Sequence, residues 1–337
     1  MKAGVVGASG YLGGELLRLL AGHPAFEVEA VQADSSAGAP LGELHPGLAP
    51  AYAGRVLEAL DPAALVGLDV VFVAVPAGRS HAIVPPLLGE VRCVVDLGAD
   101  FRLRDASAYE RWYGFTHGAP DLLGRAVYGL PELFRPALRG ADLVAAPGCY
   151  PTAACLALAP LLSAGAIDRA GIVVDAASGT SGAGRSLTAA THHAAANESF
   201  CAYGLVNHRH TPEMEQVLGA ELLFTPHLAP MTRGILATCY ATASAPTSTD
   251  EVLALLERSY AGEPFVQVAE RPPATRDAYG ANTCLLSARY DRRTGRVLVL
   301  AALDNLVKGG AGQAIQAANL ACGLDETLGL SALGMAP

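Results

Sequence analysis

Continuous apolar segments alternate with helix-like segments along the first half of the chain. Residues 3–6, 70–75 and 93–97 are short and almost wholly apolar, whereas residues 15–21 place their leucines at helical spacing. Strands that are apolar at nearly every position are buried on both faces of a sheet, as in parallel sheets covered by helices. We therefore predict an α/β domain with a doubly wound parallel sheet over residues 1–148.

The pattern changes after residue 149 to a stricter alternation of apolar and polar positions. Residues 236–243 and 297–303 alternate in this way, which is typical of half-buried antiparallel strands. We predict that residues 149–308 form a second, α+β domain with a mainly antiparallel sheet. A small-residue helix that begins near residue 309 is expected to return to the first domain, so that residues 309–337 pack there.

Charge and cysteine content narrow the possible partners and compartment. The 337 residues carry a formal net charge of −9, which argues against nucleic acid or an anionic membrane as a main partner. No apolar stretch is long enough to cross a bilayer, and the first residues lack a signal-peptide pattern. The seven cysteines form no C-x-x-C pair, which is typical of reduced cytoplasmic thiols. We expect a cytoplasmic protein that acts on a small molecule.

A glycine loop follows the first predicted strand directly. Gly7, Gly10 and Gly13 fit the spacing G-x-x-G-x-x-G between that strand and a helix. Glycines there allow a tight turn and let backbone N–H groups approach a pyrophosphate at the helix N-terminus. This context predicts a Rossmann-type dinucleotide site, with the cofactor-binding residues Gly7, Ser9, Gly10, Tyr11, Leu12 and Gly13, and Pro76 after a later strand.

The residues after the second predicted strand leave the choice of dinucleotide open. Asp34 lies 21 positions after Gly13, where an acidic residue usually bonds the ribose hydroxyls of NAD. Ser35 and Ser36 follow it and could instead turn toward the 2′-phosphate of NADP. Both cofactors remain possible from these residues.

One thiol occupies an unusual position. Cys149 lies between a Pro-Gly turn and an apolar helix predicted over residues 152–163, where unpaired N–H groups and the helix dipole favour a thiolate. A nucleophilic thiol with a nicotinamide suggests a thioester cycle: acyl transfer to sulfur, then reduction to an aldehyde. The other cysteines are expected to be buried apolar residues: Cys93, Cys155, Cys201, Cys239, Cys284 and Cys322.

The segment His208-Arg209-His210-Thr211-Pro212-Glu213 supplies acid/base candidates. Thr211 is expected to cap a helix whose first residue is Pro212. In an extended segment the two histidines would point the same way, with Arg209 opposite. A zinc site would need further ligands at suitable spacing, and we expect no metal.

Two segments carry groups suited to anions. Backbone N–H groups of the loop 178–184, Ser-Gly-Thr-Ser-Gly-Ala-Gly, could hold a phosphate or a carboxylate. Arg102 follows the strand at residues 93–97 and lies at the same sheet edge, where arginine suits bidentate recognition of either group. A flexible glycine turn and a surface ion pair are the ordinary alternatives.

Taken together, these segments resemble the N-acetyl-γ-glutamyl-phosphate reductase family of arginine biosynthesis, within the aspartate-semialdehyde dehydrogenase-like superfamily. The resemblance covers nearly the whole chain and is carried by residues 7–14, 43–46, 99–103, 147–152, 178–184, 208–213, 230–238 and 303–309. It implies an acyl-phosphate substrate and NADPH. Many members have a neutral or basic residue in place of Asp34, so NAD stays possible.

The resemblance also implies roles for individual residues. Cys149 is the implied nucleophile and His210 the implied acid/base, with His208 as the alternative. Ser178, Gly182 and Asn305 are implied to lie near the cofactor, and the chain is implied to form a homodimer or homotetramer through the second sheet. Substrate contacts are expected from Arg102, Tyr150, Arg209 and Glu213.

Other functions remain to be separated by experiment. The related acyl-phosphate reductase of the aminoadipate route to lysine and aspartate-semialdehyde dehydrogenase share the same cycle. A dinucleotide-sensing binding protein without catalysis is the alternative from another class, and it predicts an ordinary thiol at Cys149.

Overall fold

The computed structural model describes residues 1–335, which divide into two compact units. The first unit comprises Met1–Pro147 and Gly310–Leu330, and the second comprises Gly148–Gly309 together with residues 331–335. The chain therefore leaves the first unit after Pro147, returns to it at Gly310 and leaves it again after Leu330. Residues 331–335 differ from expectation, because they belong to the second unit rather than to the first.

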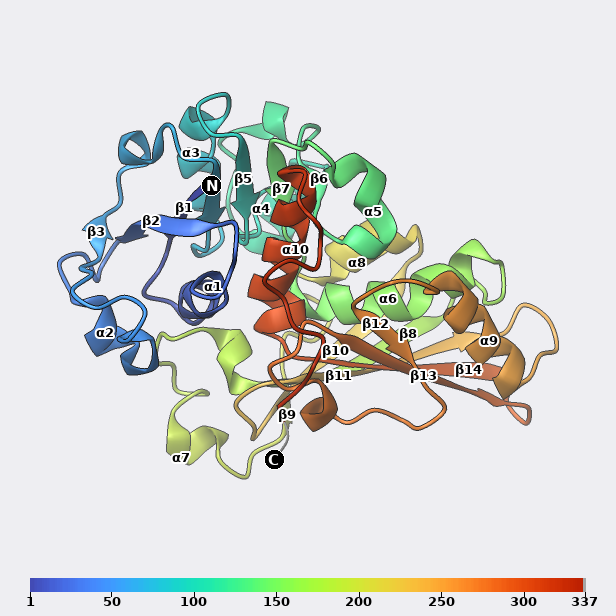
Figure 1. Cartoon of the computed structure of the whole chain (residues 1–337). Coiled ribbons are helices and arrows are strands. Elements are labelled where there is room, and N and C mark those ends of the chain that lie inside the picture. The colour runs from blue at the N-terminus through green and yellow to red at the C-terminus, as the bar shows by residue number, and fades with distance from the viewer. Residues whose placement is uncertain (336–337) are drawn as a thin grey trace. The chain divides into compact units, whose positions relative to one another are not determined.

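The first unit is built on a seven-stranded sheet with the order β3-β2-β1-β4-β5-β7-β6 (Figure 1). All its strand pairs are parallel, as the continuous apolar runs predicted. Its strands are β1 (Lys2–Val6), β2 (Glu27–Ala33), β3 (Glu58–Ala59), β4 (Val70–Val73), β5 (Cys93–Asp96), β6 (Val127–Tyr128) and β7 (Leu143–Ala145). Its helices are α1 (Tyr11–Leu20), α2 (Leu41–Leu44), α3 (Ser80–Ile83), α4 (Ser107–Tyr113), α5 (Pro131–Leu138) and α10 (Gly312–Ala321).

Two apolar cores cover the two faces of this sheet. On one face, leucines of α1 and small residues of α10 pack with alternate strand residues such as Val5 and Phe72. On the other, Val71 and Val94 pack with Ile83, Tyr109 and their neighbours. Fully burying one aliphatic side chain stabilises the folded state by about 1.5–3 kcal/mol. The loops at the carboxyl ends of the strands are therefore attached to a stably packed sheet.

The second unit has a mixed seven-stranded sheet with the order β12-β13-β14-β11-β8-β10-β9. Only the β8–β10 and β12–β13 pairs are parallel, so the predicted mainly antiparallel sheet is confirmed. Its strands are β8 (Ile172–Gly179), β9 (Cys201–Ala202), β10 (Leu222–Ala229), β11 (Ile235–Thr242), β12 (Val266–Val268), β13 (Cys284–Asp291) and β14 (Arg296–Leu303). Its helices are α6 (Cys149–Ser163), α7 (His193–Ala196), α8 (Thr211–Leu218) and α9 (Thr249–Ser259).

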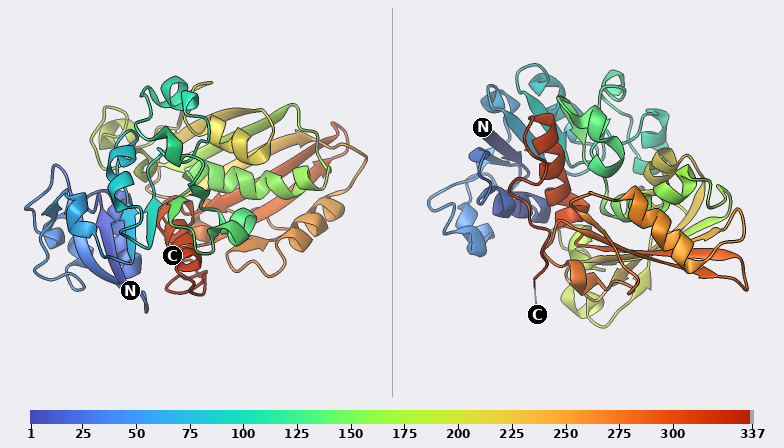
Figure 2. Two further views of the ribbon diagram at one scale, coloured as in Figure 1. Left: turned by 90° about the horizontal axis from the view of Figure 1, so that it is seen from above. Right: turned by 45° about the vertical axis from the view of Figure 1, so that its right-hand side comes forward.

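Helix α6 is the central element of the second unit. It contacts β11, β14, α8 and α9, and Figure 2 (left) shows this green helix lying across the strands. Nearly all its residues are buried, Ala153 to Leu158 among them, so it has no solvent-facing stripe. The first residue of this buried helix is Cys149. The helix therefore begins three positions earlier than predicted.

Candidate active site

The glycine loop of the first unit has the close backbone approaches that a dinucleotide site needs. Gly7 has φ +82°, and a Cβ there would lie 2.1 Å from the carbonyl oxygen of Ala74. A Cβ on Gly13 would lie 2.2 Å from the carbonyl oxygen of Gly7. Only glycine fits at these two positions, because backbone atoms cannot move aside.

Helix α1 presents its N-terminus beside this loop. Its N-cap, Gly10, supplies no side-chain cap, and the first intrahelical hydrogen bond at this end is donated by the N–H of Gly14 to the carbonyl of Gly10. The amides of Tyr11, Leu12 and Gly13 therefore have no partner within the helix. Such amides and the positive dipole end fit a pyrophosphate, so the residues present fit the expected dinucleotide.

Further residues that were expected to contact the cofactor lie after the ends of two strands. Asp34 follows β2 and is exposed, with Ser35 and Ser36 in the turn after it, and Pro76 follows β4. The Asp34 carboxylate is ion-paired with Arg79, at 2.9 Å between Oδ2 and Nη2. Sequence reasoning missed Arg79, although its position shortly after an apolar strand was a usable signal.

Arg102 lies in the first unit with its guanidinium turned onto the backbone. The side chain is 9% exposed, Nε donates to the carbonyl of Ala146 at 2.8 Å, and Nη2 donates to that of Leu97 at 3.1 Å. These carbonyls directly follow β7 and β5. The observed hydrogen bonds therefore fix the ends of two strands.

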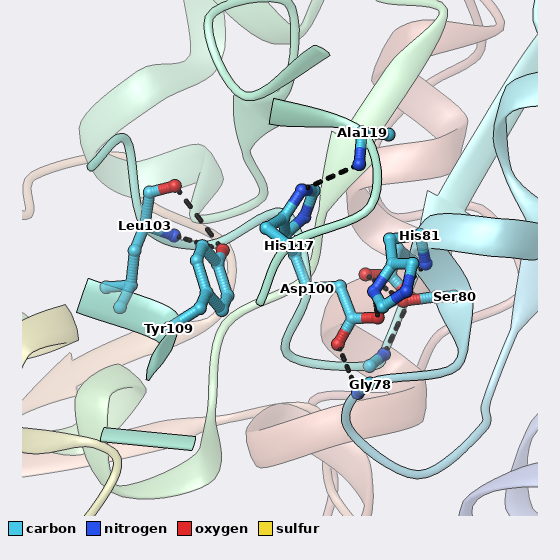
Figure 3. Close-up of polar contacts among 10 residues, drawn as sticks. Gly78, Ser80, His81, Asp100, Leu103, Tyr109, His117 and Ala119 are labelled. Atoms are coloured by element: carbon cyan, nitrogen blue, oxygen red, sulfur yellow. Dashed lines mark hydrogen bonds and ion pairs between the residues drawn. The ribbon is translucent and has the colours of Figure 1, made fainter. Parts of the chain in front are cut away.

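A buried polar cluster of the first unit is centred on Asp100 (Figure 3). Asp100 is fully buried and accepts hydrogen bonds from the N–H groups of Gly78 and His81, while His117 Nε2 lies 2.7 Å from the Asp100 carbonyl. Burial, followed by the nearby charge of Asp100, raises the pKa of Asp96 to about 7. Burial lowers the pKa of His117, so its imidazole is held neutral.

Cys149 is the first residue of α6, and its surroundings differ from those of the other cysteines. It is half-buried, whereas Cys93, Cys155, Cys239, Cys284 and Cys322 are buried and Cys201 is exposed, contrary to expectation. Burial raises the pKa of Cys93 and Cys155 well above the usual value, which makes those thiols inert. Cys149 alone combines partial access with a helix N-terminus.

Glu213 supports the turn that carries Cys149. Its carboxylate is fully buried and accepts the N–H of Gly148, the N-cap of α6, at 2.8 Å. This charge-assisted hydrogen bond holds the backbone immediately before the nucleophile. The expectation that Glu213 contacts the substrate stays a prediction; within the chain, its carboxylate bonds to the Gly148 backbone.

Two glycines allow close packing around the nucleophile. A Cβ on Gly148 would lie 2.5 Å from Nε2 of His210, and a Cβ on Gly309 would lie 2.8 Å from Cβ of Cys149. The His210 ring therefore lies against the residue before Cys149. The structure brings the predicted nucleophile and the predicted acid/base into one small region of the second unit.

His208 and His210 meet through a turn rather than through an extended segment. The Thr211 N–H donates to the His208 carbonyl at 2.9 Å, the His210 N–H donates to His208 Nδ1 at 3.1 Å, and the two ring centroids are 4.9 Å apart. The N-cap of α8 is His210, not Thr211 as predicted, because the turn continues directly into the helix.

The two histidines have different surroundings. Burial, then the charge of Arg209, lowers the pKa of His208 to about 4, so this ring is neutral at pH 7. Tyr150 contacts both rings edge-on and donates its hydroxyl to the carbonyl of His227 at 3.2 Å. Arg209, between the two histidines in the chain, is exposed. His210 is thus the histidine nearest the nucleophile turn.

A second polar group in the same unit gathers the residues expected near the cofactor. Asn305 accepts the N–H of Gly234 at 2.7 Å and donates to the Ser181 hydroxyl at 2.9 Å. A Cβ on Gly182 would lie 2.9 Å from the Ser178 hydroxyl and 3.8 Å from the Asn305 amide nitrogen. Ser178, Gly182 and Asn305 therefore lie together.

Within residues 1–335, no group of three or more His, Cys, Asp or Glu side chains is arranged to hold a metal ion. The described helices include none with the length and apolar character needed to span a membrane.

Comparison with known proteins identifies both units. The family described as "Semialdehyde dehydrogenase, NAD binding domain" matches residues 2–141, and the one described as "Semialdehyde dehydrogenase, dimerisation domain" matches residues 149–305. The chain is 50% identical to N-acetyl-gamma-glutamyl-phosphate reductase of Symbiobacterium thermophilum, over 98% of this chain and 97% of that protein. It is 47% identical to the protein of that name from Moorella thermoacetica, over the full length of both.

Solved structures with a similar fold are more distant in sequence. Aspartate semialdehyde dehydrogenase II of Vibrio cholerae is 19% identical with a TM-score of 0.69, over 95% of this chain and 97% of that one. Aspartate semialdehyde dehydrogenase of Candida albicans, solved with NADP, is 17% identical with a TM-score of 0.69, over 96% and 99%. These likenesses confirm the α/β fold.

Proposed function

This chain belongs to the N-acetyl-γ-glutamyl-phosphate reductase family, and we propose that it reduces N-acetyl-γ-glutamyl phosphate to N-acetyl-glutamate semialdehyde and phosphate in arginine biosynthesis, with NADPH as the reductant. The observation that carries this proposal is the position of Cys149 at the start of α6, with His210 against the preceding Gly148. The reduced state of all seven cysteines supports a cytoplasmic location.

The first half of the reaction is acyl transfer to sulfur. The Cys149 thiolate attacks the carbonyl carbon of the acyl phosphate, a C–S bond forms, and the C–O bond to phosphate breaks with its electron pair leaving on phosphate. The N-terminus of α6 stabilises the thiolate by about 0.3–1 kcal/mol or more in a partly buried site. Glu213 holds the Gly148 backbone, so the sulfur is positioned before substrate arrives.

The second half is reduction and release. NADPH, held in the first unit, would supply the hydride that brings the thioester carbon to the aldehyde oxidation level. His210 donates a proton to the oxyanion left on the reduced carbon, which gives a thiohemiacetal, and takes the proton back as the C–S bond breaks; this releases the aldehyde and restores the thiolate. His208, neutral because its pKa is lowered to about 4, orients His210 by accepting its backbone N–H.

Substrate recognition is assigned to groups near these residues. The exposed guanidinium of Arg209 is suited to the substrate carboxylate. Tyr150, which is 2% exposed and packs on both histidine rings, forms the wall of the acyl site. Among the candidates for the cofactor, Ser178, Gly182 and Asn305 are assigned to the nicotinamide end, and the loop 7–13 to the pyrophosphate.

The test is the reverse reaction with a panel of aldehydes. Phosphate-dependent oxidation is measured with N-acetyl-glutamate semialdehyde, aspartate semialdehyde and the aminoadipate-type semialdehyde, each with NADP and with NAD. We expect the highest kcat/KM for N-acetyl-glutamate semialdehyde with NADP. A higher value for another aldehyde would replace the substrate, and the absence of any turnover would favour a dinucleotide-binding protein.

We also propose that the chain forms a homo-oligomer through the second sheet. The strand registers align Leu223, Val173, Tyr240 and Leu298 in one apolar row across β10, β8, β11 and β14. Their neighbours along each strand are buried under the helices, so this row faces away from α6 and α9. The matching family's description as a dimerisation domain supports this assignment.

Light scattering with size-exclusion chromatography tests the interface. We expect Val173→Arg to convert the oligomer to monomer, while Glu257→Arg on the exposed side of α9 leaves it intact. An unchanged mass for Val173→Arg would exclude this face.

A further inference from the structure

An exposed ion pair joins the ends of two strands that flank the glycine loop. Asp34 follows β2, Arg79 lies in the loop after β4, and β1 lies between these strands in the sheet. The side chains of Arg79 and Asp34 are 56% and 71% exposed, with 2.9 Å between the paired atoms. In a sheet of this type, the adenosine ribose of a dinucleotide lies at the end of β2, so the pair occupies the place where 2′-OH and 2′-phosphate are distinguished.

The backbone that carries Arg79 is fixed from both sides by one buried carboxylate. Asp100 Oδ1 accepts the N–H of Gly78 at 2.7 Å, and its Oδ2 accepts the N–H of His81 at 3.0 Å (Figure 3). The Ser80 hydroxyl donates to Asp96 at 3.1 Å. Because Asp96 and Asp100 are both fully buried, the loop is rigid where it carries the guanidinium.

Gly78 gives this loop its direction. Its φ of +80° favours glycine, and a Cβ there would lie 3.2 Å from the Phe115 ring. The tight turn lets the chain reverse after β4, so that the Arg79 side chain is exposed while the next side chain, Ser80, is buried. A loop built with this many buried contacts presents one exposed cation at a defined position.

The ion pair between Arg79 and Asp34 is weak enough for another anion to replace Asp34. Exposed pairs contribute little to stability because water screens both charges. A phosphate monoester carries nearly two negative charges and offers bidentate geometry that a guanidinium matches. A bound 2′-phosphate would therefore take Arg79 from Asp34, whereas a 2′-hydroxyl would donate to Asp34 and leave the pair in place.

We propose that Arg79 binds the 2′-phosphate of NADP. In the absence of that phosphate Arg79 is paired with Asp34, and Asp34 lowers the preference for NADP because it holds Arg79 and repels the phosphate. This inference rests on the proposed function only for the presence of a dinucleotide site. Arg79 and Asp34 are then the residues that determine dinucleotide specificity: Arg79 favours NADP, and Asp34 disfavours it.

Binding of adenosine fragments tests the assignment without turnover. Isothermal titration with 2′,5′-ADP and with 5′-AMP isolates the contribution of the 2′-phosphate. We expect Arg79→Ala to weaken 2′,5′-ADP at least tenfold and to change 5′-AMP less than twofold. Asp34→Asn is expected to tighten 2′,5′-ADP and to weaken 5′-AMP.

The matched control is Arg139→Ala. Arg139 is an exposed arginine that follows α5, shortly before β7 begins. It therefore lies toward the amino ends of the parallel strands, whereas Arg79 lies at their carboxyl ends. Arg139→Ala should change neither affinity, which separates a specific contact from the loss of one positive charge. The thermal midpoint of each variant shows whether the fold is retained; an exposed Arg79 side chain predicts little change.

The outcomes separate this inference from the proposed reaction. Equal weakening of both fragments by Arg79→Ala, or no weakening of 2′,5′-ADP, overturns the assignment even if the enzyme reduces the acyl phosphate. Selective loss of 2′,5′-ADP in a protein that reduces no acyl phosphate supports the assignment and contradicts the proposed reaction.

Discussion

Helices α1 and α6 begin in the same way and serve different chemistry. Each has a glycine N-cap in extended conformation without a side-chain cap. The first residue of α1 is Tyr11, which is 42% exposed, and its free amides are open to an anion. The first residue of α6 is Cys149, and the N–H of its N-cap is already bonded to Glu213. The same backbone motif thus leaves amides available to an anion at α1 and, in the proposed mechanism, favours a thiolate at α6.

Burial explains much of this difference. Helix α1 buries one face on the sheet, through Leu16, Leu17 and Leu20. Helix α6 is buried nearly all round, so its N-terminus cannot shift to suit a ligand. A nucleophile needs such fixed geometry, because a displacement of about 1 Å can cost on the order of a hundredfold in rate.

The largest expected effect is the loss of kcat when Cys149, the first residue of α6, is replaced. We expect Cys149→Ser to lower kcat by roughly 10⁴-fold or more, since a hydroxyl is not ionised at neutral pH. Nucleotide affinity, measured by fluorescence titration, should stay within about twofold because α1 is untouched. Retained turnover would exclude the thioester mechanism.

The next effect separates the two histidines. We expect His210→Asn to lower kcat by about 10²–10⁴-fold, the range for a positioned acid/base. His208→Asn should lower kcat by less than about tenfold, because a ring with a pKa lowered to about 4 is a weak base. Steady-state kinetics measure both, and the reverse order would assign the proton transfer to His208.

Adding one methyl group at each helix start sharpens the comparison directly. Gly148→Ala would press on His210, and we expect a loss of roughly 10–10³-fold in kcat with nucleotide affinity retained. Gly13→Ala would press on the Gly7 carbonyl, and nucleotide affinity should fall instead, by at least about tenfold. Gly47→Ala is the control, because nothing lies within 4 Å of its added Cβ. Equal effects on both properties would show that the two starts are not independent.

The last prediction concerns stability rather than rate or affinity, and it involves the buried carboxyl group of Asp96 in the first unit. The pKa of Asp96 is about 7 in the folded state and 3.8 ordinarily, so the folded state holds the extra proton between these values. Asp96 therefore makes stability fall as pH rises through that window. Relative to wild type, Asp96→Asn should become more stable from pH 4 to pH 8, by at most about 1.4 kcal/mol per pH unit. Urea unfolding at both pH values measures the change; a pH-independent difference would contradict the buried titration.

The sequence predicted the parts of the molecule that depend on local patterns. Continuous apolar runs identified the parallel sheet, because strands covered on both faces leave no polar alternation. The glycine loop and the Pro-Gly-Cys turn were placed correctly, since glycine spacing and turn chemistry are local. The start of α6 was missed by three residues: Pro151 lies in the first turn of the helix, where its missing N–H costs no intrahelical hydrogen bond.

Contacts between distant segments could not be predicted in this way. Glu213 bonds to Gly148 across 65 positions, and Arg79 pairs with Asp34 across 45. Nothing periodic connects such residues, so their partners become visible only in the folded chain. The assumed extended conformation at His208 to His210 was wrong for a related reason: the turn is fixed by bonds between the two residues themselves.

The discontinuous first unit has a consequence for synthesis of the protein. Helix α10 supplies part of the core beside α1, and its residues are made after the entire second unit. All strands of the parallel sheet are therefore synthesised long before the helix that completes one face of that sheet. The domain that is started first is completed last, so a chain stopped before residue 310 would expose an apolar sheet face to the cell's quality control.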